Sequence, residues 1–116
     1  MLKLVNVLNR NYQHNVSSFK IIILEQAIAE ITESCLYYNK KLPGLGSDFE
    51  EEVFDLIELI NDNPSLFPIK FENIHEAVMT RFPFVVNYEV FGKQIIVSAV
   101  FHAKQHPDKK TKRKRK

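Results

Sequence analysis

The hydrophobic and polar positions of this 116-residue chain divide it into segments with different periods. Residues 19–24 (FKIIIL) form a short run rich in β-branched side chains, which predicts a strand buried on both faces. From Glu25 the period changes, and the spacing predicts an amphipathic helix to about Lys40. The apolar positions of this helix fall on one face: Ile28, Ile31, Cys35 and Tyr38.

A second helix is predicted after the turn KLPGLG at residues 41–46. Ser47 is placed to cap the free backbone N–H groups, and Glu50 follows three residues later, which is a capping-box arrangement. Asn63-Pro64 is expected to end the helix. Two helices joined by so short a turn should pack as an antiparallel hairpin. The core-facing stripe of the second helix comprises Phe49, Val53, Leu56, Ile57 and Ile60.

The period becomes two in the last part of the chain. Three strands are predicted, at about residues 74–82, 84–91 and 94–102. Pro83 and residues 91–93 would link them as antiparallel hairpins. The last strand is apolar on both faces, so we expect it in the middle of the sheet. The predicted fold class is α+β with the order β-α-α-β-β-β, in which a helical hairpin packs on one face of a small, mainly antiparallel sheet.

Charge is distributed unevenly along the chain. Seven of the last eight residues, KKTKRKRK, are Lys or Arg, whereas the first 108 residues carry nine basic and fourteen acidic side chains, a formal charge of −5. An acidic body does not fit a domain whose folded face grips nucleic acid. The tail either adds attraction to phosphates or simply keeps the protein in solution, and its composition predicts disorder.

The remaining composition limits the class of protein. The single cysteine, Cys35, rules out an intrachain disulfide and a thiolate metal cage, and it fits a reducing cytoplasm. The four histidines lack metal-ligand spacing, so we expect no metal site. No apolar run reaches the length of a membrane span, and polar residues interrupt the N-terminus before a secretory signal forms. We therefore expect a cytoplasmic protein.

Three stretches of the chain resemble a known family. They are YYNKKLPGLGSDFEEEV at 37–53, INDNPSLFP at 60–68 and RFPFVVNYEVFGKQIIVSAVFHAKQHP at 81–107. Together they resemble the RelE/ParE superfamily, the toxins of bacterial type II toxin–antitoxin modules, which are also known as plasmid-stabilisation proteins. The resemblance implies a toxin domain at residues 18–108, preceded by a poorly ordered extension at 1–17 and followed by the basic tail at 109–116.

The resemblance implies two kinds of activity. RelE-like members are metal-independent ribonucleases that cut mRNA in the ribosome, and ParE-like members inhibit DNA gyrase. Both kinds are silenced by a cognate antitoxin, and the complex of toxin and antitoxin often represses its own operon by binding operator DNA. Neither kind implies a cofactor or a small-molecule substrate.

The candidate catalytic residues are Arg81, His102 and Lys104. Metal-free RNA cleavage needs a base, an acid and cations around the phosphate. Two positions depart from the RelE-like pattern. Val85 stands where such enzymes tend to carry an arginine, and Gln105 stands in the place of the arginine in the motif Phe-His-x-x-Arg-x-Pro. The candidate partner-binding residues are Tyr37, Tyr38, Tyr88 and His106.

Each candidate also has a structural interpretation. His102 would end a buried strand and bond a neighbouring backbone group, and Arg81 would pair with an acidic residue such as Glu76 or Glu89. The leading hypothesis is a ParE-like toxin that binds a target protein. The alternatives are a RelE-like endoribonuclease and a chain that has lost toxicity but still binds an antitoxin. The antitoxin would bind by adding a strand to the sheet edge or by laying a helix in an apolar groove.

Overall fold

The order of elements follows the predicted pattern. The computed structural model of the chain describes residues 19–104, so the predicted extension at 1–17 and the tail at 109–116 lie outside the described residues. A short strand, β2, precedes the last three strands and was not predicted. The elements are β1 (Lys20–Ile23), α2 (Glu25–Lys41), α3 (Leu45–Asp62), β2 (Ile69–Phe71), β3 (Ile74–Val78), β4 (Phe84–Phe91) and β5 (Gln94–His102).

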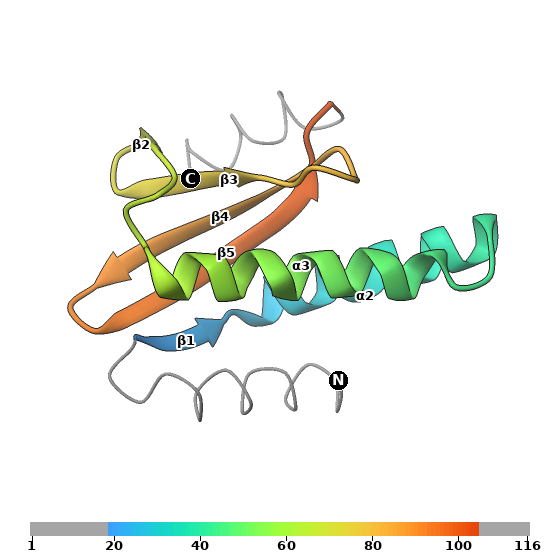
Figure 1. Cartoon of the computed structure of the whole chain (residues 1–116), viewed down its shortest axis with the longest axis horizontal. Coiled ribbons are helices and arrows are strands. Elements are labelled where there is room, and N and C mark those ends of the chain that lie inside the picture. Colours follow the sequence, from blue (N-terminus) through green and yellow to red (C-terminus); the bar gives the residue numbers. More distant parts are fainter. Residues whose placement is uncertain (1–18, 105–116) are drawn as a thin grey trace.

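The strands form one five-stranded sheet in the order β1-β5-β4-β3-β2. β1 is parallel to β5, and the other neighbours are antiparallel. β5 pairs on both sides, as its apolar faces predicted. α3 runs across the sheet and α2 lies beside it, antiparallel to it (Figure 1). The fold is therefore α+β with a helical hairpin on a mainly antiparallel sheet, as expected.

β1 is an edge strand, and the prediction that it is buried on both faces is wrong. It pairs only with β5, from Lys20 opposite Gln94 to Ile23 opposite Val97. Lys20 is exposed and the three isoleucines are half-buried. A β-branched run of this length does not reveal how many neighbours a strand has, because an edge strand that covers one end of the core carries the same residues.

α3 begins earlier than its capping signal indicated. Gly44 is the N-cap residue, with a φ of 92°, and no side chain caps the helix. Ser47 therefore lies inside the first turn, and the predicted capping box does not form. Glycine adopts this left-handed conformation without the steric cost of a Cβ atom, so the chain reverses at Gly44 and the helix starts at once.

Four aromatic rings join the hairpin to the sheet. Phe49 of α3 lies 5.2 Å from Phe82 and 4.8 Å from Phe84, measured between ring centroids. Tyr38 of α2 lies 4.9 Å from Phe82 and 5.5 Å from Phe49. We call Tyr38, Phe49, Phe82 and Phe84 the aromatic cluster. Its three phenylalanines belong to the main hydrophobic core, against which Tyr38 packs. This core contains residues from both helices and from the three longest strands.

The two helices touch where α3 begins. The backbone N–H of Gly46 donates to the Oδ1 atom of Asn39, 2.8 Å away, and Gly46 is buried. A Cβ atom at Gly46 would overlap the backbone carbonyl oxygen of Cys35 and lie 2.7 Å from the side-chain amide of Asn39. The close approach of the helices therefore requires glycine at this position.

We expect Gly46→Ala to destabilise the fold by about 2 kcal/mol because of this overlap. In an unconstrained helix the same change would stabilise by about 1 kcal/mol. Urea unfolding followed by circular dichroism measures the difference. Ser47→Ala is the matched control, and it should change stability by less than about 0.5 kcal/mol because Ser47 caps nothing. A stabilised Gly46→Ala variant would contradict the close approach.

Candidate functional site

A groove of about 570 Å³ lies where the end of α2 meets β4 and β5. We call it the aromatic groove. α2 contributes Glu33, Ser34, Tyr37, Tyr38 and Lys41, and the remaining lining residues are Leu45, Phe84 and His102. The structure therefore brings together three of the residues predicted from the sequence: Tyr37, Tyr38 and His102.

The two tyrosines of the aromatic groove have different environments. Tyr37 has 55% of its surface exposed, and the Nζ atom of Lys41 lies 5.2 Å from its ring centroid. Tyr38 packs into the aromatic cluster. Burial raises the pKa of Tyr38, and the neighbouring Tyr37 raises it further. Tyr37 can therefore contact a partner through its exposed ring, whereas Tyr38 mainly holds α2 against the core.

His102 ends β5 and bonds to the backbone beyond it. Its Nδ1 atom accepts a hydrogen bond of 3.1 Å from the backbone N–H of Lys104, and its ring lies 5.3 Å from that of Phe84. This confirms the structural interpretation of His102 as a group that bonds a neighbouring backbone atom. With Nδ1 accepting, the neutral ring carries its proton on Nε2. In this state Nε2 is a hydrogen-bond donor and not a general base.

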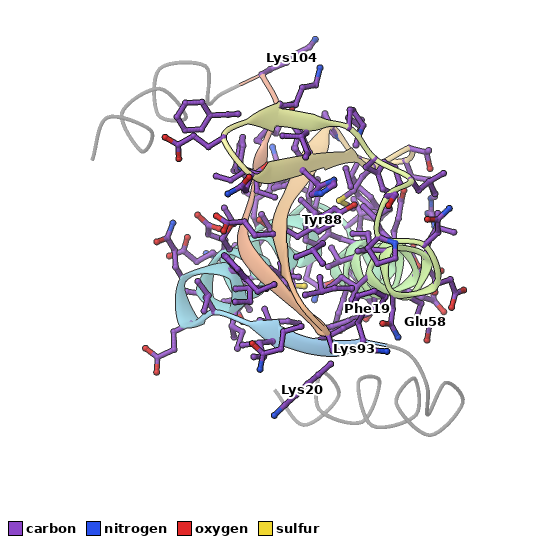
Figure 2. The ribbon with its side chains drawn as sticks, turned by 90° about the vertical axis from the view of Figure 1, so that its left-hand side faces the viewer. Phe19, Lys20, Glu58, Tyr88, Lys93 and Lys104 are labelled. Carbon is purple, nitrogen blue, oxygen red and sulfur yellow. The ribbon has the colours of Figure 1, made fainter. Side chains whose placement is uncertain are left out.

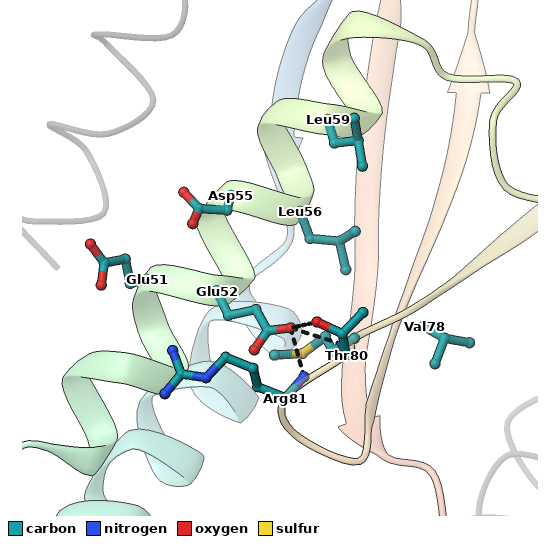
Figure 3. Close-up of a pocket in the computed structure, with 9 residues that line it drawn as sticks. Glu51, Glu52, Asp55, Leu56, Leu59, Val78, Thr80 and Arg81 are labelled. Carbon is teal, nitrogen blue, oxygen red and sulfur yellow. Dashed lines mark hydrogen bonds between the residues drawn. The ribbon is translucent and has the colours of Figure 1, made fainter.

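Arg81 lies in a second groove, of about 330 Å³, between α3 and the connection from β3 to β4 (Figure 3). We call it the acidic groove. α3 contributes Glu51, Glu52, Asp55, Leu56 and Leu59, and residues 78–81 form the other wall. Among the residues predicted to form a catalytic site, Arg81 and His102 thus line different grooves.

The acidic partner of Arg81 is not the predicted one. Its guanidinium lies 3.5 Å from a carboxylate oxygen of Asp48 on α3 and 5.6 Å from the ring centroid of Phe82. The predicted partners, Glu76 and Glu89, lie on the face of the sheet away from the helices, because the strand positions that alternate with them fill the core. Arg81 keeps 59% of its side chain exposed.

Glu52 fixes the connection between β3 and β4. One of its carboxylate oxygens accepts hydrogen bonds from the backbone N–H groups of Thr80 and Arg81, at 2.8 and 3.0 Å, and from the hydroxyl of Thr80 at 2.9 Å (Figure 3). β3 accordingly ends at Val78, whereas the sequence predicted a strand to about residue 82. Nothing in the sequence distinguishes Glu52 from the acidic residues around it.

The hydrogen bonds to Glu52 also set its acidity. Burial alone would raise the pKa of Glu52, but the hydrogen bonds from Arg81 and Thr80, together with the charge of Arg81, lower it below its ordinary value of 4.5. The carboxylate is therefore stabilised in its charged form at neutral pH.

Tyr88 is a core residue, so the prediction that it contacts a partner does not fit the structure. Its side chain is fully buried, and its hydroxyl donates a 2.6 Å hydrogen bond to the carbonyl of Pro64. Its ring stacks on that of His75 at 4.7 Å. Burial raises the pKa of Tyr88 to about 12. Figure 2 shows Tyr88 inside the molecule and Lys104 pointing away from it.

The three inner strands of the sheet supply none of the cations that a ribonuclease site needs. β3, β4 and β5 contain no Lys or Arg. On the face of the sheet away from the helices, Val85 is buried, and Glu76 and Asn87 lie side by side on neighbouring strands. His106 and Gln105, which follow β5, lie outside the described residues.

The described residues form neither a metal-binding cluster nor a membrane-spanning helix. Within residues 19–104, no group of three or more His, Cys, Asp or Glu side chains is placed to hold a metal ion. No helix in the same part of the chain is long and apolar enough to cross a membrane.

We expect Glu52→Gln to lower the free energy of unfolding by about 1 kcal/mol at neutral pH, because a neutral amide accepts these hydrogen bonds more weakly. The folded state lowers the pKa of Glu52, so the carboxylate stabilises the fold above pH 4.5, the ordinary value, and this stabilisation is lost as the pH falls through the lowered pKa. The gap between wild type and variant should therefore narrow under acid conditions.

Urea unfolding at neutral pH and well below pH 4.5 measures this gap. Glu51→Gln is the control, because Glu51 is exposed and lies beside Glu52 in the same groove. A gap of equal size at both pH values would show that the charge of Glu52 does not contribute.

Comparison with known proteins identifies the fold. No family model matches the chain, and no curated protein matches its sequence. Among solved structures, the chain is similar to one chain of a structure described as the chromosomal ParDE TA system from P. aeruginosa. The TM-score is 0.64 at 14% sequence identity, and the match covers 71% of this chain and 92% of the other. The chain therefore has a RelE/ParE-like fold.

Proposed function

We propose that this chain is the toxin of a bacterial type II toxin–antitoxin module, that it is ParE-like, and that it acts by binding a target protein such as DNA gyrase. A cognate antitoxin would neutralise it in the cytoplasm. The similarity of its fold to a chain of a ParDE system supports the module. The observation that favours binding over RNA cleavage is the lack of Lys and Arg on β3, β4 and β5.

The chemistry of RNA cleavage strengthens this preference. The pentavalent phosphate needs cations close to the base and the acid. Glu76 lies on the uncovered face of the sheet, where its charge would repel a phosphate, and Val85 offers only methyl groups. Arg81 lines the acidic groove and pairs with Asp48, away from the groove that contains His102.

One observation favours the second candidate function, a RelE-like, ribosome-dependent mRNA endoribonuclease. His102 and Lys104 are adjacent at the end of β5, and the side chains of Lys104 and Arg81 reach solvent. In that case His102 would transfer a proton after a change of tautomer, and the two cations would contact phosphates. A third candidate is a chain that retains antitoxin binding and has lost toxicity.

The geometry of the sheet limits where an antitoxin strand would add. β5 extends beyond the end of β1, but α2 lies along this stretch, and Glu30 accepts a 2.7 Å hydrogen bond from the backbone N–H of Val100. The edges available for an added strand are therefore the outer sides of β1 and β2, together with the end of β3 that β2 does not pair. As in other modules of this type, the complex would bind operator DNA and stabilise a plasmid.

Expression of the chain alone in a bacterial host tests the proposal. We expect growth inhibition with intact mRNA, and inhibition of supercoiling when the purified chain is added to gyrase. His102→Ala and Arg81→Ala should retain this activity because neither residue acts in catalysis. Primer extension maps the mRNA ends. New mRNA breaks that disappear in His102→Ala would overturn the proposal in favour of the ribonuclease, and normal growth would favour the third candidate.

Tyr37→Ala tests whether the aromatic groove contacts the target. We expect the variant to need an inducer concentration about tenfold higher for the same growth inhibition, because a tyrosine that is buried in an interface is a common hot spot. It should leave the thermal midpoint nearly unchanged, because Tyr37 is exposed. Leu36→Ala is the matched control on α2, outside the groove and 60% exposed. Equal effects of both variants would exclude a specific role for the groove.

A further inference from the structure

The acidic groove has an apolar floor that reaches solvent. Leu56 and Met79 are buried beneath it, whereas 45% of Leu59 and 59% of Val78 are exposed. Leu59 stands on α3 in the same groove as Leu56 (Figure 3). Val78 ends β3 opposite Val85, so its side chain lies on the face of the sheet away from the helices. An exposed leucine beside a buried apolar floor can bury a further aliphatic side chain against it.

The rim of this groove is negatively charged. The carboxylates of Glu51 and Asp55 project outward from α3 (Figure 3). They belong to a row of acidic residues at alternating three- and four-residue spacing, which places them on one side of the helix. The row comprises Asp48, Glu51, Asp55, Glu58 and Asp62.

The positive charge in the acidic groove is smaller than the negative charge of its rim. Arg81 is the cation that lines the groove, and its guanidinium pairs with Asp48. The described residues as a whole contain seven Lys or Arg and thirteen Asp or Glu, a formal charge of −6. The electrostatic field at this surface therefore favours a positively charged occupant.

We propose that the acidic groove is a docking site for a short segment of a partner protein in which one or two aliphatic residues are flanked by Lys or Arg. The aliphatic side chains would lie against Leu59 and over the floor formed by Leu56 and Met79, and the cations would face Glu51 and Asp55. The charge complementarity of the rim identifies the flanking residues, and the apolar floor identifies the central ones. This site is independent of the target assumed in the proposed function.

Two other occupants fit the groove less well. The basic tail of this chain, KKTKRKRK, matches the charge of the rim but contains no apolar residue to cover Leu59. A second copy of the folded domain would bring a surface with the same excess of acidic residues, and like charges across an interface oppose association.

Two short synthetic peptides test the proposal with the full-length chain. They share a central pair of leucines, which are flanked by lysines in one peptide and by glutamates in the other. Fluorescence anisotropy should show binding of the lysine peptide, weakened by added salt, and no binding of the glutamate peptide. Leu59→Asp and Asp55→Lys should each weaken the lysine peptide about tenfold, which corresponds to the loss of one good contact.

Matched controls separate this site from general charge attraction. Two control variants introduce the same charges at exposed positions of α2: Leu36→Asp matches Leu59→Asp, and Glu25→Lys matches the charge reversal of Asp55→Lys. Both controls should leave binding unchanged. The proposal is overturned if both peptides bind alike, if neither binds, or if the controls lose binding equally. It is also overturned if the lysine peptide binds only to a shortened chain that ends at Pro107 and therefore lacks the basic tail. That result would assign the groove to the tail. A dimer in sedimentation that Leu59→Asp dissociates would instead assign it to a second copy.

Because growth inhibition plays no part in this readout, the peptide experiment and the test of the proposed function can fail separately. A non-toxic chain that binds the lysine peptide retains the docking site, and a toxic chain that binds neither peptide lacks it.

Discussion

The packing of the aromatic cluster is the interaction on which both grooves depend. Tyr38, Phe49, Phe82 and Phe84 come from α2, from α3, from the connection after β3 and from β4. Edge-to-face contacts of this kind add roughly 1 kcal/mol each beyond the burial of apolar area. The cluster also separates the aromatic groove from the acidic groove. Tyr38 and Phe84 line the aromatic groove, whereas Phe82 supports the guanidinium of Arg81 beside the acidic groove. The separation of Arg81 from His102 thus follows from how the core packs.

Two acidic side chains determine where the strands end and which edges remain open. Glu52 accepts hydrogen bonds from the backbone N–H groups of Thr80 and Arg81, so β3 stops and the chain turns toward β4. Glu30 satisfies the backbone N–H of Val100 at the place where β1 no longer covers β5. An unpaired backbone group in a sheet edge is a binding site for another strand. Glu30 therefore closes the free edge of β5, and the edges that remain open are those of β1, of β2 and of the end of β3 that β2 does not pair.

The sequence predicted the elements well, because the period of each one reflects which of its faces are buried. The apolar stripe of Phe49, Val53 and Ile57 identified α3, and the two apolar faces of β5 identified an inner strand. Features that depend on contacts between distant segments were not predictable. The exposure of β1 depends on having a single neighbour, the start of α3 on the conformation of Gly44, and the end of β3 on Glu52, which lies 28 residues before Thr80.

The candidate site was predictable only in part, for a related reason. Tyr37, Tyr38 and His102 meet in one groove, but the pattern did not reveal that Tyr88 points into the core or that Arg81 pairs with Asp48. Burial of Tyr88 and the pairing of Arg81 both depend on α3, which has its acidic side chains on one side and its apolar ones on the other. A helix with this distribution holds the sheet by its apolar face and repels phosphates with its outer face. The same element that completes the core therefore gives this side of the molecule a negatively charged surface, which opposes the approach of a phosphate backbone.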